Sequence, residues 1–207
     1  MSWVNPVAAN NGDPLTLVRW NQDAVDNPQF LYDNLGVWDA KAGYTELGAP
    51  ANFTFPNISQ AYDTLILVAS LRSVLSGGGN NDNVRIRFNN DAGNNYGYSY
   101  LTQVSTTVAG VGNTGLSYIP FLYAPTADAT ALVYASLFMV IPWYSEAVNH
   151  KTVTLHGHTG SNLTNFKGGA TWMNPTPQAI TRIDISPLVG ANFAAGSKAA
   201  LFGAQSI

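Results

Sequence analysis

The sequence contains no cysteine, and only two of its 207 residues are glutamate. The absence of cysteine excludes a disulfide scaffold, a thiol nucleophile and a cysteine-ligated zinc site. Charged residues make up only 10% of the chain, against about 25% in an average soluble domain. Nine Lys and Arg residues and 12 Asp and Glu residues give a net charge of −3, so there are too few cations for the basic face of a nucleic-acid-binding protein.

Long hydrophobic runs are also lacking. The longest run, residues 131–143, is interrupted by Pro142 and is shorter than the ~20 residues that cross a bilayer. The first residues contain neither a basic stretch nor an apolar stretch, so we expect no signal peptide and no membrane anchor. A cytoplasm is the expected site of synthesis.

Hydrophobic residues amount to 46% and aromatic residues to 12%, which is enough to build the core of one domain. The surface must owe its solubility to uncharged polar groups, since the chain has 21 Asn, 17 Thr and 14 Ser residues. Such a surface forms hydrogen bonds without strong charge repulsion. It suits proteins that pack beside copies of themselves and proteins that bind sugars.

The N-terminal fifth of the chain has the pattern of an arm. Residues 1–18 contain Asn-Pro and Asp-Pro turns and few periodic apolar positions, which predicts an extended segment. A short helix is expected to follow, capped by Asp26 or Asn27, with Pro28 in its first turn and Gly36 at its end. This helix packs either on its own domain or on a neighbouring subunit.

The pattern changes to β-strands from residue 51 onward. Val84, Ile86 and Phe88 alternate with Arg85 and Arg87, which predicts a strand with one apolar face. Further strands are predicted within or around residues 61–74, 116–123, 131–141, 153–155, 180–185 and 201–202.

Clusters of Gly, Asn and Ser separate these runs and predict turns at residues 76–83, 89–95, 110–115, 157–162 and 190–196. The sequence thus predicts an all-β fold, a jelly-roll-like β-sandwich over residues 51–207. Residues 1–50 are predicted to form an extended N-terminal arm with one short helix, which docks on neighbouring subunits.

Catalytic patterns are sparse. Hydrolysis of glycosides needs paired carboxylates, but the two glutamates are Glu46 and Glu146, and most aspartates lie in turn contexts. No Gly-x-Ser-x-Gly nucleophile motif is present. We therefore predict no catalytic residue, no enzymatic activity and no cofactor, with a glycan-cleaving enzyme as the hypothesis that the scattered carboxylates leave open.

Three histidines, His150, His156 and His158, share the same parity and would lie on one face of a continuous strand. Copies around a symmetry axis could complete a metal site there. The alternative, which we favour, is exposed or interfacial histidines, because Gly157 is expected at a turn. No metal is predicted.

Aromatic residues are the remaining binding candidates. Tyr96, Tyr98 and Tyr100 alternate and should stand on one face of a strand, while Trp143 follows a buried apolar run and Trp172 follows Gly168-Gly169. Such rings pack in a core, fill a subunit interface or stack on sugars.

Several short patterns are similar to those of structural proteins on the outside of tailed-bacteriophage virions. They comprise Trp20-Asn21, Asp26-Asn27 and Leu31; then Leu71-Arg72-Ser73, Val84 to Asn89, Asp91, Gly93, Asn95 and Tyr96; and finally Ile180 to Ile183, Asn192-Phe193, Gly196-Ser197 and Leu201-Phe202-Gly203. The chain departs from the family ending at Phe202, where the family pattern has tyrosine. Residues 97–145 carry no likeness.

The resemblance implies a β-rich homotrimer on the virion surface, made in the host cytoplasm. Decoration or cement proteins of this kind stabilise the head by bridging major capsid subunits. The implied partner-binding residues of the arm and helix are Trp20, Asn21, Asp26, Asn27 and Leu31. Neither nucleic acid nor membrane is an expected partner.

The alternative is a receptor-binding module of a tail or fibre. It would bind a carbohydrate on the host surface with the face of Tyr96, Tyr98 and Tyr100, or with Trp143 and Trp172.

Overall fold

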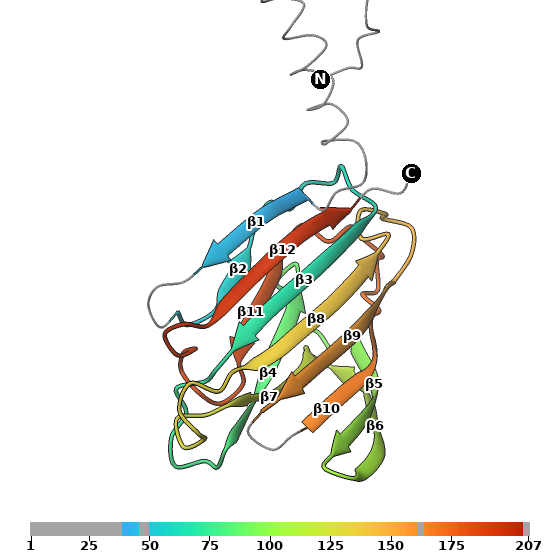
Figure 1. The fold of residues 1–207 in the computed structure, drawn as a ribbon. Helices are drawn as coiled ribbons and strands as arrows, with labels where there is room; N and C mark the ends of the chain where they lie inside the picture. Colours follow the sequence, from blue (N-terminus) through green and yellow to red (C-terminus); the bar gives the residue numbers. More distant parts are fainter. Residues whose placement is uncertain (1–38, 46–49, 161–163, 205–207) are drawn as a thin grey trace, which may run out of the picture.

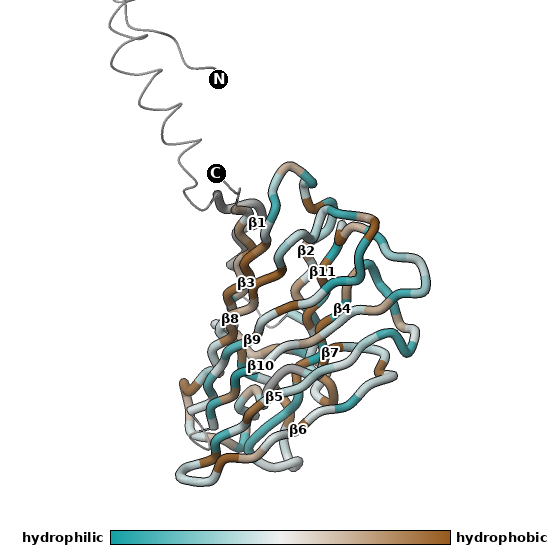
Figure 2. Tube along the Cα trace, turned by 90° about the vertical axis from the view of Figure 1, so that its right-hand side faces the viewer, coloured by the Kyte–Doolittle hydropathy of each residue, from teal (hydrophilic) through white to brown (hydrophobic). Residues whose placement is uncertain are grey.

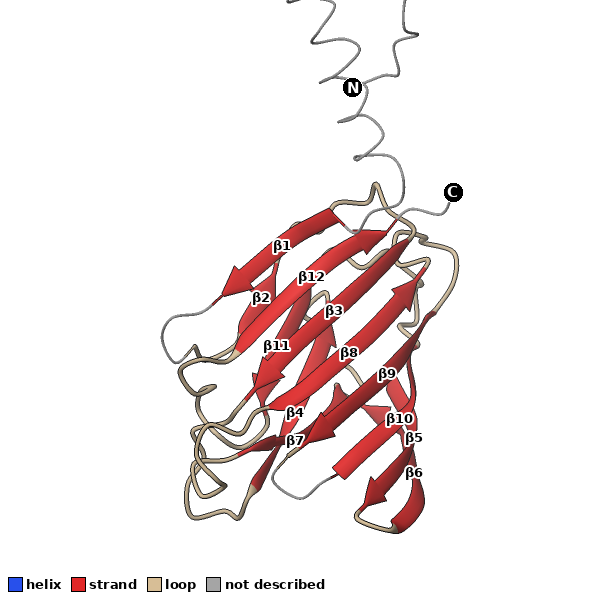
Figure 3. Cartoon of the chain, in the orientation of Figure 1, coloured by secondary structure: helices blue, strands red, loops and turns tan. Residues whose placement is uncertain are grey.

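The computed structural model describes residues 39–45, 50–160 and 164–204, and in these ranges all regular structure is β-strand (Figures 1 and 3). The strands are β1 (Asp39–Thr45), β2 (Phe53–Phe55), β3 (Thr64–Leu71), β4 (Asn81–Phe88), β5 (Tyr96–Val104), β6 (Thr107–Leu116), β7 (Ile119–Pro125), β8 (Ala135–Pro142), β9 (Lys151–Thr159), β10 (Thr164–Trp172), β11 (Ile183–Pro187) and β12 (Lys198–Ala204). The described part contains no helix long and apolar enough to cross a lipid bilayer. The short helix predicted after Asn27 lies outside the described residues.

Two antiparallel sheets pack face to face as a β-sandwich, which confirms the predicted fold class. The large sheet has eight strands in the order β1-β12-β3-β8-β9-β10-β5-β6, and the small sheet has four in the order β2-β11-β4-β7. The side view in Figure 2 shows them as two layers, with β1, β3 and β8 on one side and β2, β11 and β4 on the other.

The chain passes from one sheet to the other several times. β1, β3, β8 and β12 belong to the large sheet, whereas β2, β4, β7 and β11 belong to the small sheet. Two strand pairs interrupt this path: β5 and β6 lie between β4 and β7 in sequence, and β9 and β10 lie between β8 and β11. β9 pairs with β8, and β5 pairs with β10, so the two inserted pairs lengthen the large sheet on the side of β8 and make it wider than the small sheet (Figure 1).

The core lies between the sheets because apolar residues alternate with polar ones along most strands. In β4, Val84, Ile86 and Phe88 are buried, and Arg85 and Arg87 point outward, as predicted. The large sheet contributes the buried residues Leu65, Leu67, Met139, Ile141, Leu155 and Leu201, and the small sheet contributes Phe53, Phe55, Ile183 and Ile185.

A buried cation joins β3 to the loop before β8. The Arg72 side chain is buried, and its Nη1 donates to the carbonyl oxygens of Thr130 at 2.7 Å and Val133 at 2.9 Å. Nη2 donates to the Ala129 carbonyl oxygen at 3.0 Å. These bonds to backbone oxygens satisfy the guanidinium without a carboxylate partner, so Arg72, one of the residues behind the phage resemblance, holds the fold together.

Two turn predictions are wrong. Residues 110–115 lie within β6, and Gly157 lies within β9. The sequence did not predict β6 because the residues from Thr107 to Gly115 are exposed and show no apolar alternation. The strand is held in place by its pairing with β5. The boundary at residue 51 also does not coincide with the start of the sandwich, since β1 precedes it and pairs with β12.

Candidate functional site

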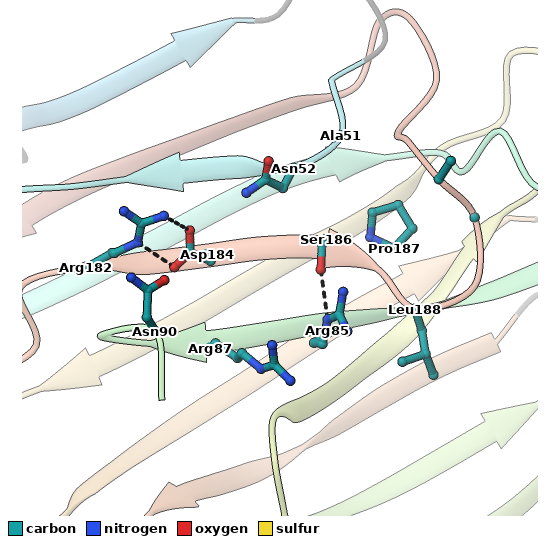
Figure 4. Close-up of a pocket in the computed structure, with 12 residues that line it drawn as sticks. Ala51, Asn52, Arg85, Arg87, Asn90, Arg182, Asp184, Ser186, Pro187 and Leu188 are labelled. Carbon is teal, nitrogen blue, oxygen red and sulfur yellow. Dashed lines mark hydrogen bonds and ion pairs between the residues drawn. The ribbon is translucent and has the colours of Figure 1, made fainter. Parts of the chain in front are cut away.

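The outer face of the small sheet contains a polar cleft of about 400 Å³ (Figure 4). Strands β4 and β11 form its floor, and their register places Ser186 opposite Arg85 and Asp184 opposite Arg87. The cleft is lined by Ala51, Asn52, Arg85, Arg87, Asn90, Arg182, Asp184, Ser186, Pro187, Leu188, Gly190 and Ala191. Three of the nine Lys and Arg residues of the chain therefore meet in one cleft.

One of the three arginines, Arg182, already has an anionic partner. Arg182 forms a two-pronged ion pair with Asp184, in which Nε donates to Oδ2 and Nη2 donates to Oδ1, both at 2.7 Å. Asp184 Oδ1 also accepts the Thr54 hydroxyl at 2.7 Å. The hydrogen bonds to Asp184 raise the pKa of the Arg182 guanidinium above its ordinary value. The geometry is that of an ion pair, whose two charges offset each other.

The other two arginines have no such partner among the described residues. Arg85 Nε donates to Ser186 Oγ at 3.0 Å, and Arg87 Nε donates to the Ser117 carbonyl oxygen at 2.9 Å. These single bonds fix the direction of each guanidinium and leave both of its terminal amino groups unused. The site is therefore a preset, positively charged surface.

Sequence reasoning placed Arg85 and Arg87 correctly on the outward face but did not single them out as a site. The available signal was two arginines at alternate positions of an exposed strand in a chain with few cations. Their meeting with Arg182 depends on the register between β4 and β11, which the sequence does not show.

Tyr96 and Trp172, two of the predicted binding aromatics, are buried core residues. The Trp172 ring packs edge-on against Phe88 with centroids 5.7 Å apart and stacks on Tyr96 at 6.3 Å. Its indole Nε1 donates to Asp91 Oδ2 at 2.6 Å. Asp91, predicted as a turn residue, thus anchors the largest side chain of the core.

Several donors surround the Asp91 carboxylate. Asn95 Nδ2 donates to Oδ2 and the Gly93 amide donates to Oδ1, both at 2.8 Å. Burial alone would raise the pKa of the Asp91 carboxyl, but the bonds from Asn95, Trp172 and Gly93, together with the charge of Arg87, hold that pKa below its ordinary value. Asp91 is therefore ionised, and its carboxylate holds Trp172, Asn95 and the Gly93 amide in place.

Tyr98 and Tyr100 lie together on the inward face of β5, with ring centroids 4.6 Å apart. The Tyr100 hydroxyl donates to the Pro120 carbonyl oxygen at 2.7 Å, and its ring lies 6.1 Å from that of Phe166. A small hollow of about 90 Å³ opens beside them, lined by Asn83, Tyr98, Tyr100, Thr102, Val111, Pro120, Tyr123 and Phe166. Its size suits packing better than a sugar ring.

The buried tyrosines predict a loss of stability in alkali. Desolvation raises the pKa values of Tyr96 and Tyr100 far above the ordinary value of about 10. Above pH ~10 the unfolded chain releases these protons and the folded chain keeps them, so the free energy of unfolding falls with pH, by about 1.4 kcal/mol per pH unit for each group. Denaturant unfolding between pH 8 and 11.5 measures this slope.

Lys151 acts in the opposite direction over a lower pH range. Its buried Nζ donates to the carbonyl oxygens of Glu146 and Asn149, and burial lowers the pKa of its ammonium group. Stability attributable to Lys151 rises from its folded pKa up to about 10.5 and is constant above that.

The slope above pH 10.5 is therefore due to the tyrosines. The variant Tyr100→Phe should halve the fall in the free energy of unfolding per pH unit there, and an unchanged slope would contradict the role assigned to Tyr100.

The remaining aromatic and histidine candidates do not converge. Trp143 follows β8 in a left-handed conformation with φ of 51° and is 54% exposed. His156 and His158 point outward from β9, whereas His150 is exposed and precedes the strand. His158 Nδ1 lies 2.8 Å from Asn165 Oδ1, and within the described ranges no three His, Asp or Glu side chains come together as metal ligands.

The arm residues implied by the resemblance, Trp20, Asn21, Asp26, Asn27 and Leu31, lie outside the described residues. Their role as partner contacts stays a prediction. No protein-family model, no curated protein and no solved structure matches this chain.

Proposed function

We propose that this chain is a structural protein of a bacteriophage virion, a trimeric decoration or cement protein that bridges major capsid subunits and stabilises the head. The observation that carries the proposal is a hairpin with exposed apolar side chains at the edge of the large sheet, in which all strands other than β1 lack acidic residues. The short sequence patterns similar to phage virion proteins point the same way.

The edge hairpin consists of β5 and β6. On one face, Leu101 is 62% exposed and Val108 is 63% exposed, and on the other face Val104 and Val111 are exposed as well. Exposed apolar side chains grouped in this way mark interaction surfaces. In addition, β6 is the last strand of the large sheet, so one row of its backbone groups has no neighbouring strand in the sheet.

The outer face of the large sheet continues this surface. Val68 and Phe138 lie opposite each other on β3 and β8, and both are exposed. Apart from β1, which begins at Asp39, the strands of the large sheet contain no Asp or Glu residue. A second copy of the chain, or a shell subunit, can therefore approach this face without repulsion between carboxylates.

The strand order supports a jelly roll as the underlying fold. If the two inserted strand pairs are set aside, the eight other strands are, in sequence order, β1, β2, β3, β4, β7, β8, β11 and β12. Their order in the sheets is then first-eighth-third-sixth and second-seventh-fourth-fifth, which is the strand order of a jelly roll. This architecture is common in capsid proteins and lectins.

A protein of this kind works by mass action. Each copy that binds the assembled shell and not its separate subunits shifts the equilibrium toward the shell. Such a role needs flat, uncharged surfaces and tight self-association, and it needs no catalytic group.

The oligomeric state tests the proposal. The full chain should sediment as a trimer, and the double variant Leu101→Asp/Val108→Asp should reduce the mass about threefold to that of a monomer, because the new carboxylates would be buried unpaired in the interface. The variant Val148→Asp is the matched control, since Val148 is 78% exposed in the loop between β8 and β9.

A wild-type chain that is monomeric at all concentrations would contradict the trimer.

The head location is tested separately by imaging labelled virions. Hundreds of copies on the head support the proposal, whereas a few copies at the tail tip support the second candidate, a receptor-binding module of a tail or fibre, which the polar cleft beside Arg85 and Arg87 favours.

A further inference from the structure

The arginine cleft on the small sheet has the features of a ligand site that the assembly function does not use. Arg85 and Arg87 are half-buried, and each is oriented by one hydrogen bond from Nε. A planar guanidinium held in this way can donate two parallel bonds to a carboxylate at low entropic cost. A set of oriented, unused donors is what a binding site needs before its ligand arrives.

The charge balance in the cleft fits one negative charge. Arg182 is neutralised by Asp184. Asp91 lies near enough to Arg87 for their charges to interact, although its oxygens already accept bonds from Trp172, Asn95 and Gly93. An excess of between one and two positive charges is left around Arg85 and Arg87, so a singly charged carboxylate matches the cleft.

The neutral lining fits the rest of a sugar ring. The Asn90 amide forms no hydrogen bond within the described residues, and the Asn52 amide uses its Nδ2 on Thr54 and keeps its oxygen free to accept. Amides of this kind bond to sugar hydroxyls, and Pro187 and Leu188 supply an apolar edge for ring C–H groups. A volume of about 400 Å³ is large enough for one or two sugar rings.

We propose that the cleft binds an acidic sugar, with its carboxylate on Arg85 and Arg87 and its hydroxyls on Asn52 and Asn90. This inference is independent of the trimer and of the location on the virion. A uronic acid or a sialic acid has the required chemistry, and surface polysaccharides that contain them are the ligand class.

The test is a calorimetric titration of the full chain with an oligosaccharide of glucuronic acid. The controls are a glucose oligosaccharide of the same length, inorganic phosphate and a peptide of glutamate residues. We expect binding of the uronic acid ligand, loss of about tenfold in affinity for each of Arg85→Gln and Arg87→Gln, and no change for Lys167→Gln, which removes an exposed cation from the other sheet.

The competing ligands decide between explanations. Equal affinity for the glucose oligosaccharide would overturn the role of the carboxylate, and equal or tighter binding of phosphate or of the glutamate peptide would overturn the sugar in favour of an anion site or an acidic protein partner. NMR signals of the arginine side chains provide a readout on the unmutated protein. If saturating uronic acid leaves the Nε–H signals of Arg85 and Arg87 unshifted, the proposal is wrong.

Discussion

Replacement of Trp172 by alanine should lower the free energy of unfolding by about 3–5 kcal/mol. Trp172 is among the largest fully buried side chains of the described chain, and it packs against Phe88 of the small sheet and Tyr96 of the large sheet. Its removal leaves a cavity between the two sheets and withdraws one donor from the Asp91 carboxylate. Equilibrium unfolding in urea measures the loss.

Two further variants separate the causes. Trp172→Phe keeps much of the apolar ring but removes the bond to the half-buried Asp91 carboxylate, so it should cost about 1–3 kcal/mol, the usual cost of a lost bond to a charged group. Trp143→Ala changes an exposed tryptophan and should stay within about 0.5 kcal/mol. If Trp172→Ala lowers the free energy of unfolding no more than Trp143→Ala does, the packing of Trp172 between the two sheets does not stabilise the fold as proposed.

The variant Gly168→Ala should destabilise the chain by more than ~3 kcal/mol, at or beyond the upper end of typical overpacking. Gly168 lies in β10 opposite Tyr100 of β5, and an added methyl group would stand 2.1 Å from the carbonyl oxygen of Ser99 and 2.7 Å from the Tyr100 Cα. Both are backbone atoms, so relief requires that β5 move away from β10 and that ladder hydrogen bonds be lost. Thermal and urea unfolding report the effect.

Gly110 provides the matched control in the neighbouring hairpin strand. A methyl group there meets no atom within 4 Å, and alanine lowers the entropy of the unfolded chain, so Gly110→Ala should be neutral or slightly stabilising. Similar stabilities for the two alanine variants would show that β5 and β10 are further apart than described. Loss of the Tyr100 packing in Gly168→Ala should also appear as a changed near-ultraviolet circular dichroism signal.

Part of this fold was predictable because period-two alternation is a direct consequence of a half-buried strand. Residues 84–88 show it clearly, and the structure places Val84, Ile86 and Phe88 in the core. β6 could not be predicted in this way, because a strand without a buried face leaves no hydrophobic pattern. Its glycines are typical of turns, yet the strand accommodates them, and at Gly110 and Gly115 an added methyl group would meet no atom within 4 Å.

The candidate site was predictable only in fragments. The sequence places Arg85 and Arg87 on one face of a strand, but Asp184 in β11 and Arg182 directly before it come almost 100 residues later, brought beside them by the pairing of β4 with β11. The same holds for Trp172 and Asp91, which are 81 residues apart in sequence. Aromatic spacing therefore suggested a binding face where the structure has a core.

The position of β12 between β1 and β3 has a consequence for folding during synthesis on the ribosome. When β1 to β11 have left the ribosome, nearly all the apolar surface has been delivered, yet the large sheet still lacks the strand that joins β1 to β3, and only β12 can fill that place. The pairing of β12 with β1 and β3 joins strands that are distant in sequence, and such pairing makes folding slow. Until it forms, the unpaired edges of β1 and β3 are exposed to neighbouring nascent chains. Chaperone demand during synthesis should therefore end abruptly when β12 emerges.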